Sequence, residues 1–154
     1  MGDRAVAGFR SKSGESETTI YLYQHWSGEG QIEYFSNALQ NAMPRWKDAS
    51  YATRIMVSHL VGDQWTSETG FGLYVGGTSH GADYAYILIA DFQAQAVLVC
   101  DNNNSDYEIA SIPFDEFIQN AGVLVADLTM DFCKEKDDEF MKKYGLDKVI
   151  STSL

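Results

Sequence analysis

Proline, cysteine and long apolar runs are all scarce in this sequence of 154 residues. The two cysteines, Cys100 and Cys133, are too few for a disulfide framework or a zinc cage, so we expect buried free thiols. No apolar run approaches the roughly 18 residues that a membrane-spanning helix needs. Residues 1–15 also lack an apolar stretch of signal-peptide length. These absences predict a cytoplasmic protein without a membrane segment.

Lysine and arginine are absent from the whole middle of the chain. Residues 55–133 contain eleven acidic side chains and no basic one, whereas the segments on either side are balanced. The net charge of −11 therefore arises entirely in this middle part. A negative field of this kind repels nucleic acid and favours basic partners, so we expect no direct nucleic-acid binding. A solvated acidic surface that only opposes aggregation explains the same pattern.

The familiar catalytic and cofactor motifs are missing as well. The chain contains neither HExxH nor CxxC, and its asparagine-rich segment at residues 101–106 does not meet the EF-hand pattern. A Walker lysine and the dinucleotide glycine spacing are also absent. We therefore expect no metal site and no cofactor, and catalysis becomes the less favoured interpretation.

The patterns that are present predict one α+β domain spanning residues 1–154, with a loose N-terminus at residues 1–7. Alternating β-branched and aromatic residues predict strands at 8–10, 19–23, 71–75, 84–90, 95–100 and 107–112. Apolar residues at helical spacing predict helices at 31–43, 49–60, 113–121 and 134–144. We expect a mostly antiparallel sheet with helices packed on one face, since the links between strands are too short for parallel crossovers.

The richest aromatic density lies in TIYLYQHWSG, at residues 19–28. Its strand ends at His25 and Trp26, just before a predicted helix, and such junctions often present functional side chains. Here His25 could act as an acid or base, and Tyr23 and Trp26 could line a pocket for a planar ligand such as a nucleobase. The alternative is that these side chains are simply packed in the core.

A second group of candidates lies between and beyond the two central helices. Arg45 and Arg54 bracket the interhelix link that contains Trp46, where they could clamp an anion, although a surface ion pair explains Arg45 more simply. Glu68 and Thr69 belong to a polar stretch with two glycines that could wrap a phosphate or cap a sheet. No catalytic residue is assigned. The predicted ligand-binding residues are Tyr23, His25, Trp26, Arg45, Trp46, Arg54, Glu68 and Thr69.

Three segments resemble a family of small uncharacterised bacteriophage proteins: YLYQHWSG at residues 21–28, RWKDASYATRI at 45–55 and ETGFGL at 68–73. The resemblance covers roughly the first half of the chain and brings no established activity or catalytic residues with it. It implies a phage or prophage origin, and hence the cytoplasm of an infected bacterium. Because small accessory phage proteins often inhibit host systems, it also implies, by analogy of context, an inhibitor of host defence.

The sequence thus favours a non-catalytic protein that acts by binding. Its acidic region could mimic nucleic acid in a basic groove of a host protein, or Trp26 and Trp46 could stack the base of a sequestered nucleotide-like signal. One alternative is a small hydrolase or transferase that uses His25 with a carboxylate such as Glu68 or Asp48. Another is a virion or assembly component whose sheet edges pair between subunits. A homo-oligomer is compatible with each hypothesis.

Overall fold

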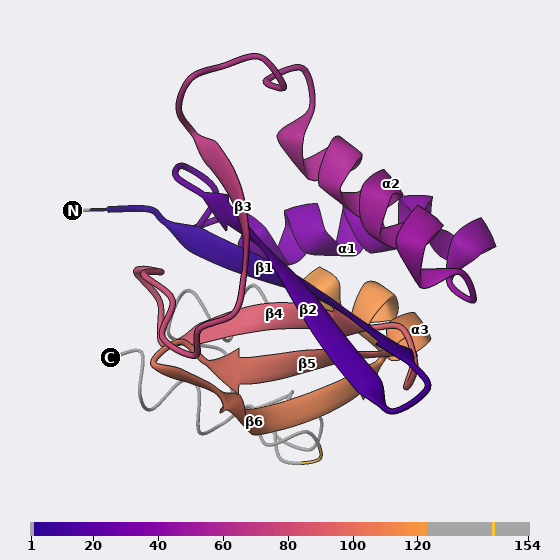
Figure 1. Ribbon diagram of the computed structural model, residues 1–154. Helices are drawn as coiled ribbons and strands as arrows, with labels where there is room; N and C mark the ends of the chain where they lie inside the picture. Colours follow the sequence, from indigo (N-terminus) through magenta and orange to yellow (C-terminus); the bar gives the residue numbers. More distant parts are fainter. Residues whose placement is uncertain (1, 123–142, 144–154) are drawn as a thin grey trace.

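A computed structural model describes residues 2–122 and residue 143 of the chain (Figure 1). Its elements are β1 (Ala5–Ser13), β2 (Ser16–Gln24), α1 (Gln31–Asn41), the 3-10 helix η1 (Met43–Arg45), α2 (Ala49–Val61), β3 (Phe71–Val75), β4 (Tyr86–Asp91), β5 (Ala96–Asp101), β6 (Asn104–Pro113) and α3 (Phe114–Gln119). The predicted α+β class is confirmed. The helix predicted at residues 134–144 lies, apart from Lys143, outside the described residues.

One six-stranded sheet has the order β3-β2-β1-β4-β5-β6. Neighbouring strands are antiparallel except β1 and β4, which pair in parallel from Ala7↔Leu88 to Arg10↔Asp91. The prediction of a mostly antiparallel sheet is confirmed, but the exclusion of parallel pairing is wrong for this pair. No short link joins these two strands. The chain passes through β2, two helices and β3 between them, which is long enough to return it in the same direction.

The prediction of a loose segment at residues 1–7 is wrong for its second half. Ala5, Val6 and Ala7 open β1 and are almost completely buried. The reason is the place of β1 in the sheet, where it pairs with β2 on one side and with β4 on the other. Small apolar residues can occupy such a central strand because both of its faces are covered.

The described helices α1, α2 and α3 pack on one face of the sheet, as predicted (Figure 1). Strand alternation directs Phe9 and Leu22 to this face, where they meet Phe35 of α1, Met56 of α2 and Phe117 of α3 in the main core. The rings of Phe9 and Phe35 stack with centroids 6.4 Å apart. This core holds the two-helix hairpin against the sheet.

The opposite face of the sheet carries a second, smaller buried cluster. Its buried members are the alternate side chains of the same strands: Val6, Tyr21, Ile87, Ile89, Leu98 and Cys100. The chain after β3 crosses to the start of β6, where the backbone N–H of Ser105 donates to the carbonyl of Thr78 over 2.9 Å. The loop that follows β3 therefore reaches β6, at the other end of the sheet order, on this face.

Several element boundaries differ from the sequence predictions, and two of them have a simple physical reason. The first helix ends at Asn41 and not at residue 43, and Pro44 lies in the first turn of η1, where its missing N–H costs nothing. The predicted polar loop at residues 101–106 is a tight hairpin, because Asp101 pairs with Asn104 and β6 starts there. The Asp101 carboxylate accepts a hydrogen bond of 2.7 Å from the N–H of Asn103. This hydrogen bond forms an Asx turn, so the connection between β5 and β6 is shorter than the predicted loop.

Candidate functional site

The structure brings the HW junction and the ETG segment together. The backbone N–H of His25 donates to the carbonyl of Gly70 over 2.9 Å, and the Trp26 ring lies against Gly70. Gly70 has φ +102°, a conformation that glycine adopts without a Cβ penalty. Two of the three segments that carry the sequence resemblance are therefore neighbours in space, and Thr69 adjoins the contact.

Two of the candidate side chains at this junction, His25 and Trp26, are turned toward solvent, whereas Tyr23 is partly buried against the second cluster. Tyr23 Oη and His25 Nδ1 lie 2.6 Å apart, and the rings of His25 and Trp26 meet edge to face at 5.1 Å. His25 and Trp26 are both exposed, so the alternative that they are packed core residues does not hold. Among the described contacts, no hydrogen bond or ion pair joins His25 to Glu68 or to Asp48. The acid–base pair that a hydrolase based on His25 requires is not formed.

Trp46 is partly buried and packs against the main core at the other end of α1. Its indole N–H donates to the carbonyl of Leu39 over 3.0 Å, and its ring packs on Phe114 with centroids 4.8 Å apart. The 11 residues of α1 separate Trp46 from Trp26 along the chain, and a helix of that length spans about 16 Å. The two tryptophans are not brought into one base-stacking site.

The two candidate arginines are also separate from the junction. Arg45 lies 4.6 Å from the centroid of the Tyr51 ring and 3.9 Å from a carboxylate oxygen of Asp48, and both of these partners are close to it in sequence. Arg54 is exposed on α2. The surface ion pair expected for Arg45 as the simpler explanation is thus present, and no shared anion clamp with Arg54 is seen among the described contacts.

The edge strand β3 exposes apolar side chains to solvent. Its five residues, FGLYV, include no charged side chain, and it pairs only with β2. Leu73 is 55% exposed and Val75 is 66% exposed. Trp65, in the loop that leads into β3, is exposed as well. Apolar side chains on an unpaired edge invite pairing with another chain.

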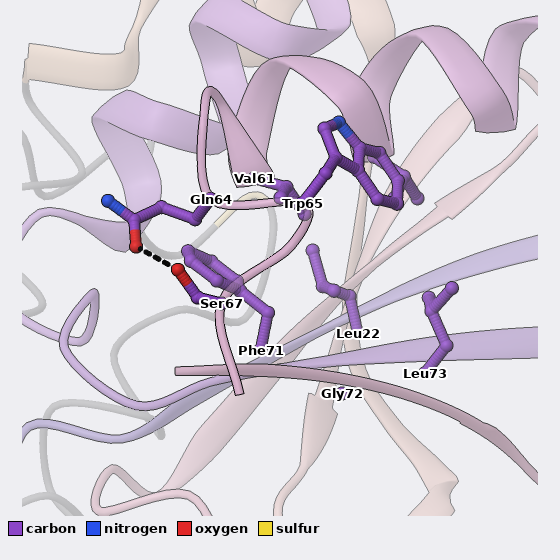
Figure 2. A pocket seen from close by; sticks show the side chains of 9 residues that line it. Leu22, Val61, Gln64, Trp65, Ser67, Phe71, Gly72 and Leu73 are labelled. Atoms are coloured by element: carbon purple, nitrogen blue, oxygen red, sulfur yellow. Dashed lines mark hydrogen bonds between the residues drawn. The ribbon is translucent and has the colours of Figure 1, made fainter. Parts of the chain in front are cut away.

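A pocket of about 190 Å³ lies beside this edge, between the end of α2, the following loop and strands β2 and β3. Figure 2 shows the rings of Trp65 and Phe71 and the side chain of Leu22 around it, and the hydrogen bond of 3.0 Å from Ser67 Oγ to Gln64 Oε1 that braces the loop. The lining residues are Leu22, Val57, Val61, Gln64, Trp65, Ser67, Phe71, Gly72 and Leu73. None of these lining residues is among the eight ligand-binding residues predicted from the sequence.

The other edge of the sheet, β6, is built differently. It exposes Tyr107 to a similar degree, 51%, but Tyr107 lies between the exposed carboxylates of Asp106 and Glu108. Charged side chains are the usual protection of an edge strand against pairing with other chains. Within the described sheet, the apolar edge is therefore β3.

The opposite face of the sheet holds a buried chain of hydrogen bonds through His80. Tyr74 Oη lies 2.6 Å from His80 Nδ1, and His80 Nε2 lies 3.1 Å from Ser105 Oγ. Tyr21 Oη is 3.3 Å from the same serine oxygen. His80 and Ser105 are 2% and 4% exposed. Burial lowers the pKa of His80, which keeps its imidazole neutral at pH 7, and burial raises the pKa of Tyr74 to about 12.

A second pocket, of about 280 Å³, adjoins this hydrogen-bonded chain at Ser105 and Tyr21. Its remaining lining residues are Arg10, Glu17, Thr18, Thr19, Val75, Gly76, Gly77 and Asp106. Arg10 Nε donates to Thr19 Oγ1 over 2.9 Å and lies 3.8 Å from a carboxylate oxygen of Glu17. Sequence reasoning missed this site because His80 and Ser105 are 25 positions apart in predicted loops, and the topology alone unites them.

Comparison of the chain with known protein families, with curated proteins and with solved structures found no match. Among the described residues, no group of three or more His, Cys, Asp or Glu side chains is placed to hold a metal ion. The helices in the described part of the chain include none that is long and apolar enough to cross a membrane. The fold and its surface define an α+β protein with one apolar sheet edge.

Proposed function

We propose that this protein acts by binding a protein partner, which adds an extended segment to the exposed edge of β3. The observation that carries this proposal is the contrast between the two edges of the sheet. The β3 edge lacks charge and exposes Leu73 and Val75, whereas Asp106 and Glu108 protect the β6 edge. An unprotected edge strand is the surface that strand-addition complexes use.

The adjoining pocket gives this mode of binding a source of specificity. In strand addition, backbone hydrogen bonds supply affinity and pockets for alternate side chains select the sequence. The pocket beside Trp65 and Leu73 is lined largely by apolar groups and opens next to the β3 backbone. An apolar side chain of the added segment fits this environment, and its burial adds to the backbone pairing.

The charge around β3 indicates the character of the partner. Asp63 and Glu68 lie in the loop before β3, and residues 55–122, which include β3, contain no lysine or arginine. A partner segment that combines apolar and basic residues is complementary to this surface. This proposal shares with the acidic-face hypothesis only the preference for a basic partner, since here a segment of the partner docks on β3 and this protein does not enter a basic groove of a host factor. The nucleotide-sequestering alternative has no geometric support, since Trp26 and Trp46 lie apart.

The proposal is tested by affinity capture from a bacterial lysate with three forms of the protein. Leu73→Lys places a charge on the apolar edge, and Tyr107→Lys places the same charge on the other edge at a residue of similar exposure. We expect the wild type and Tyr107→Lys to retain one common partner and Leu73→Lys to lose it at least tenfold. Binding should also weaken as salt rises from about 0.05 to 0.5 M, because complementary charges are screened.

Two results would contradict the proposal. One is a partner that Leu73→Lys retains at the wild-type level. The other is a dimer in solution that Leu73→Lys alone converts to a monomer, which would assign the edge to a second copy of this chain.

The proposed role against host defence needs its own assay, in which the protein is expressed in a bacterium with active defence systems. Plaque counts that rise for the wild type and not for Leu73→Lys would support it.

A further inference from the structure

The buried chain from Tyr74 through His80 to Ser105 has the parts of an activated nucleophile. A serine becomes nucleophilic when a neutral imidazole nitrogen within hydrogen-bond reach can take its proton, and when a third group orients that imidazole. The distances from Ser105 Oγ to His80 Nε2, 3.1 Å, and from His80 Nδ1 to Tyr74 Oη, 2.6 Å, meet both conditions. Ser105 is 4% exposed, and the second pocket, which it lines, is the side from which a small molecule approaches its hydroxyl.

We infer that Ser105 is a nucleophile that takes an acyl group from a small ester bound in this pocket, with His80 as its base and Tyr74 as the residue that positions His80. The reactive side chains of this site differ from those of the β3 edge, because Tyr74 and Leu73 are adjacent on the strand and face opposite sides of the sheet. The two sites share Val75, which is exposed at the β3 edge and also lines this pocket.

The pocket defines the class of substrate. Glu17 and Asp106 are both in its lining, and Arg10, its cationic member, is already 3.8 Å from Glu17. The pocket therefore repels a carboxylate or a phosphate and accepts a neutral or cationic ester. Tyr21 Oη, 3.3 Å from the serine oxygen, is placed to donate a hydrogen bond to the oxyanion that develops next to Ser105.

In the proposed acyl transfer, Ser105 attacks the ester and His80 carries the proton. Ser105 Oγ forms a bond to the ester carbonyl carbon while its proton passes to His80 Nε2. The bond from this carbon to the alcohol oxygen then breaks, and the alcohol leaves with the proton from His80. Water, the second reactant, later attacks the acyl-serine through the same base and releases the carboxylic acid. Tyr74 is a neutral phenol and not a carboxylate, so it stabilises the imidazolium weakly and turnover should be slow.

The state of the imidazole is the first test. Only the tautomer with a proton on Nδ1, donated to Tyr74 Oη, leaves Nε2 free to accept the proton of Ser105. Nitrogen-15 NMR of protein labelled at histidine should show His80 with a protonated Nδ1 and an unprotonated Nε2. Tyr74→Phe should shift the equilibrium between the two tautomers toward the one protonated on Nε2. If Tyr74 has only a structural role, the substitution should leave this equilibrium unchanged. A wild-type His80 that carries its proton on Nε2 would overturn the inference.

The second test is covalent labelling with diisopropyl fluorophosphate. Attack by Ser105 Oγ forms an oxygen–phosphorus bond, breaks the phosphorus–fluorine bond, and releases fluoride and the serine proton. Intact mass and peptide mapping should show one modified residue, Ser105. Ser105→Ala should lose this label entirely, whereas Ser111→Ala, at an exposed serine of the same strand, should keep it. His80→Gln should slow labelling at least tenfold.

A variant can lose the label because Ser105 is less reactive or because the variant does not fold, so folding is measured separately. Circular dichroism and thermal unfolding of each variant show whether it keeps the native fold. Absence of label on Ser105 in the folded wild type would overturn the inference, and so would equal labelling rates in the wild type and a folded His80→Gln.

Discussion

The indole of Trp26 lies against the α-carbon of Gly70, so that a Cβ built on this glycine would be 2.6 Å from ring atom Cζ3. Together with the hydrogen bond from the His25 N–H to the Gly70 carbonyl, this contact ties the end of β2 to the start of β3. It fixes the entry of the chain into the edge strand on which the proposed function depends. The same contact joins two segments that the sequence analysis could treat only as separate motifs.

Gly70→Ala should destabilise the protein by about 1–3 kcal/mol, which is the usual cost of a non-glycine residue in a strained backbone conformation. The φ of +102° disfavours any Cβ, and the Trp26 ring must move in addition. Gly72→Ala is the matched control, because a Cβ there meets no atom within 4 Å. Urea unfolding measures both variants, and equal stabilities would contradict this account.

The ion pair between Arg4 and Asp83 predicts a dependence of stability on acid pH. Side-chain and backbone hydrogen bonds from Arg4 lower the pKa of Asp83 from 3.8 to about 2. Because the folded-state pKa is lower than the unfolded one, the contribution is complete above about pH 4 and is lost as the pH falls toward 2. Asp83→Asn should flatten the curve of stability against pH in this window. The exposed Asp63→Asn serves as the control, and an unchanged curve for Asp83→Asn would refute the prediction.

Trp46 and Trp26 should differ in what they contribute to stability. Trp46→Ala removes a packed ring and the hydrogen bond to Leu39, and we expect a loss of about 2–4 kcal/mol. Trp26→Ala removes a ring that is mostly exposed, so the loss should stay under about 1 kcal/mol. Chemical denaturation of both variants provides the comparison. Similar losses would show that Trp26 is packed as deeply as Trp46.

The hydroxyl of Tyr86 offers a substitution that should not harm the protein. Tyr86 is completely buried, and its Oη has no hydrogen-bond partner among the described residues. Burial of an unsatisfied hydroxyl costs about 1–3 kcal/mol, which Tyr86→Phe removes while it keeps the ring. We expect the free energy of unfolding to stay the same or to rise by about 1 kcal/mol. A clear loss of stability would show that the hydroxyl has a partner in solution.

Much of the local structure could be predicted because it follows from short-range patterns. The alternation in β2 and β3 and the helical spacing in α1 are properties of neighbouring residues, and they require no knowledge of the rest of the chain. The exclusion of a parallel pair failed because it considered only the links between consecutive strands. The loose N-terminus was predicted wrongly because Ala5 and Val6 carry little periodic signal, although the sheet buries them in its central strand.

The candidate site was only partly predictable, for the same reason. The HW junction is local, so His25 and Trp26 could be singled out and are indeed exposed beside Gly70. The approach of His80 to Ser105 depends on the chain crossing from β3 to β6, and no pattern within either segment encodes it. The separation of Trp26 from Trp46 follows from the length and direction of α1. The number of aromatic residues in the sequence gives no information about either.

The sequence by itself determined the α+β class, the positions of most elements and the acidic, lysine- and arginine-free middle of the chain. These features depend on composition and on residues close together in sequence. Only the tertiary structure decided that β3 is an apolar edge, that β1 and β4 run in parallel, and that Tyr74, His80 and Ser105 form one hydrogen-bonded chain. The physical reason is that strand order and the contacts across a sheet are set by the packing of the whole core, where distant segments compete for the same buried surface.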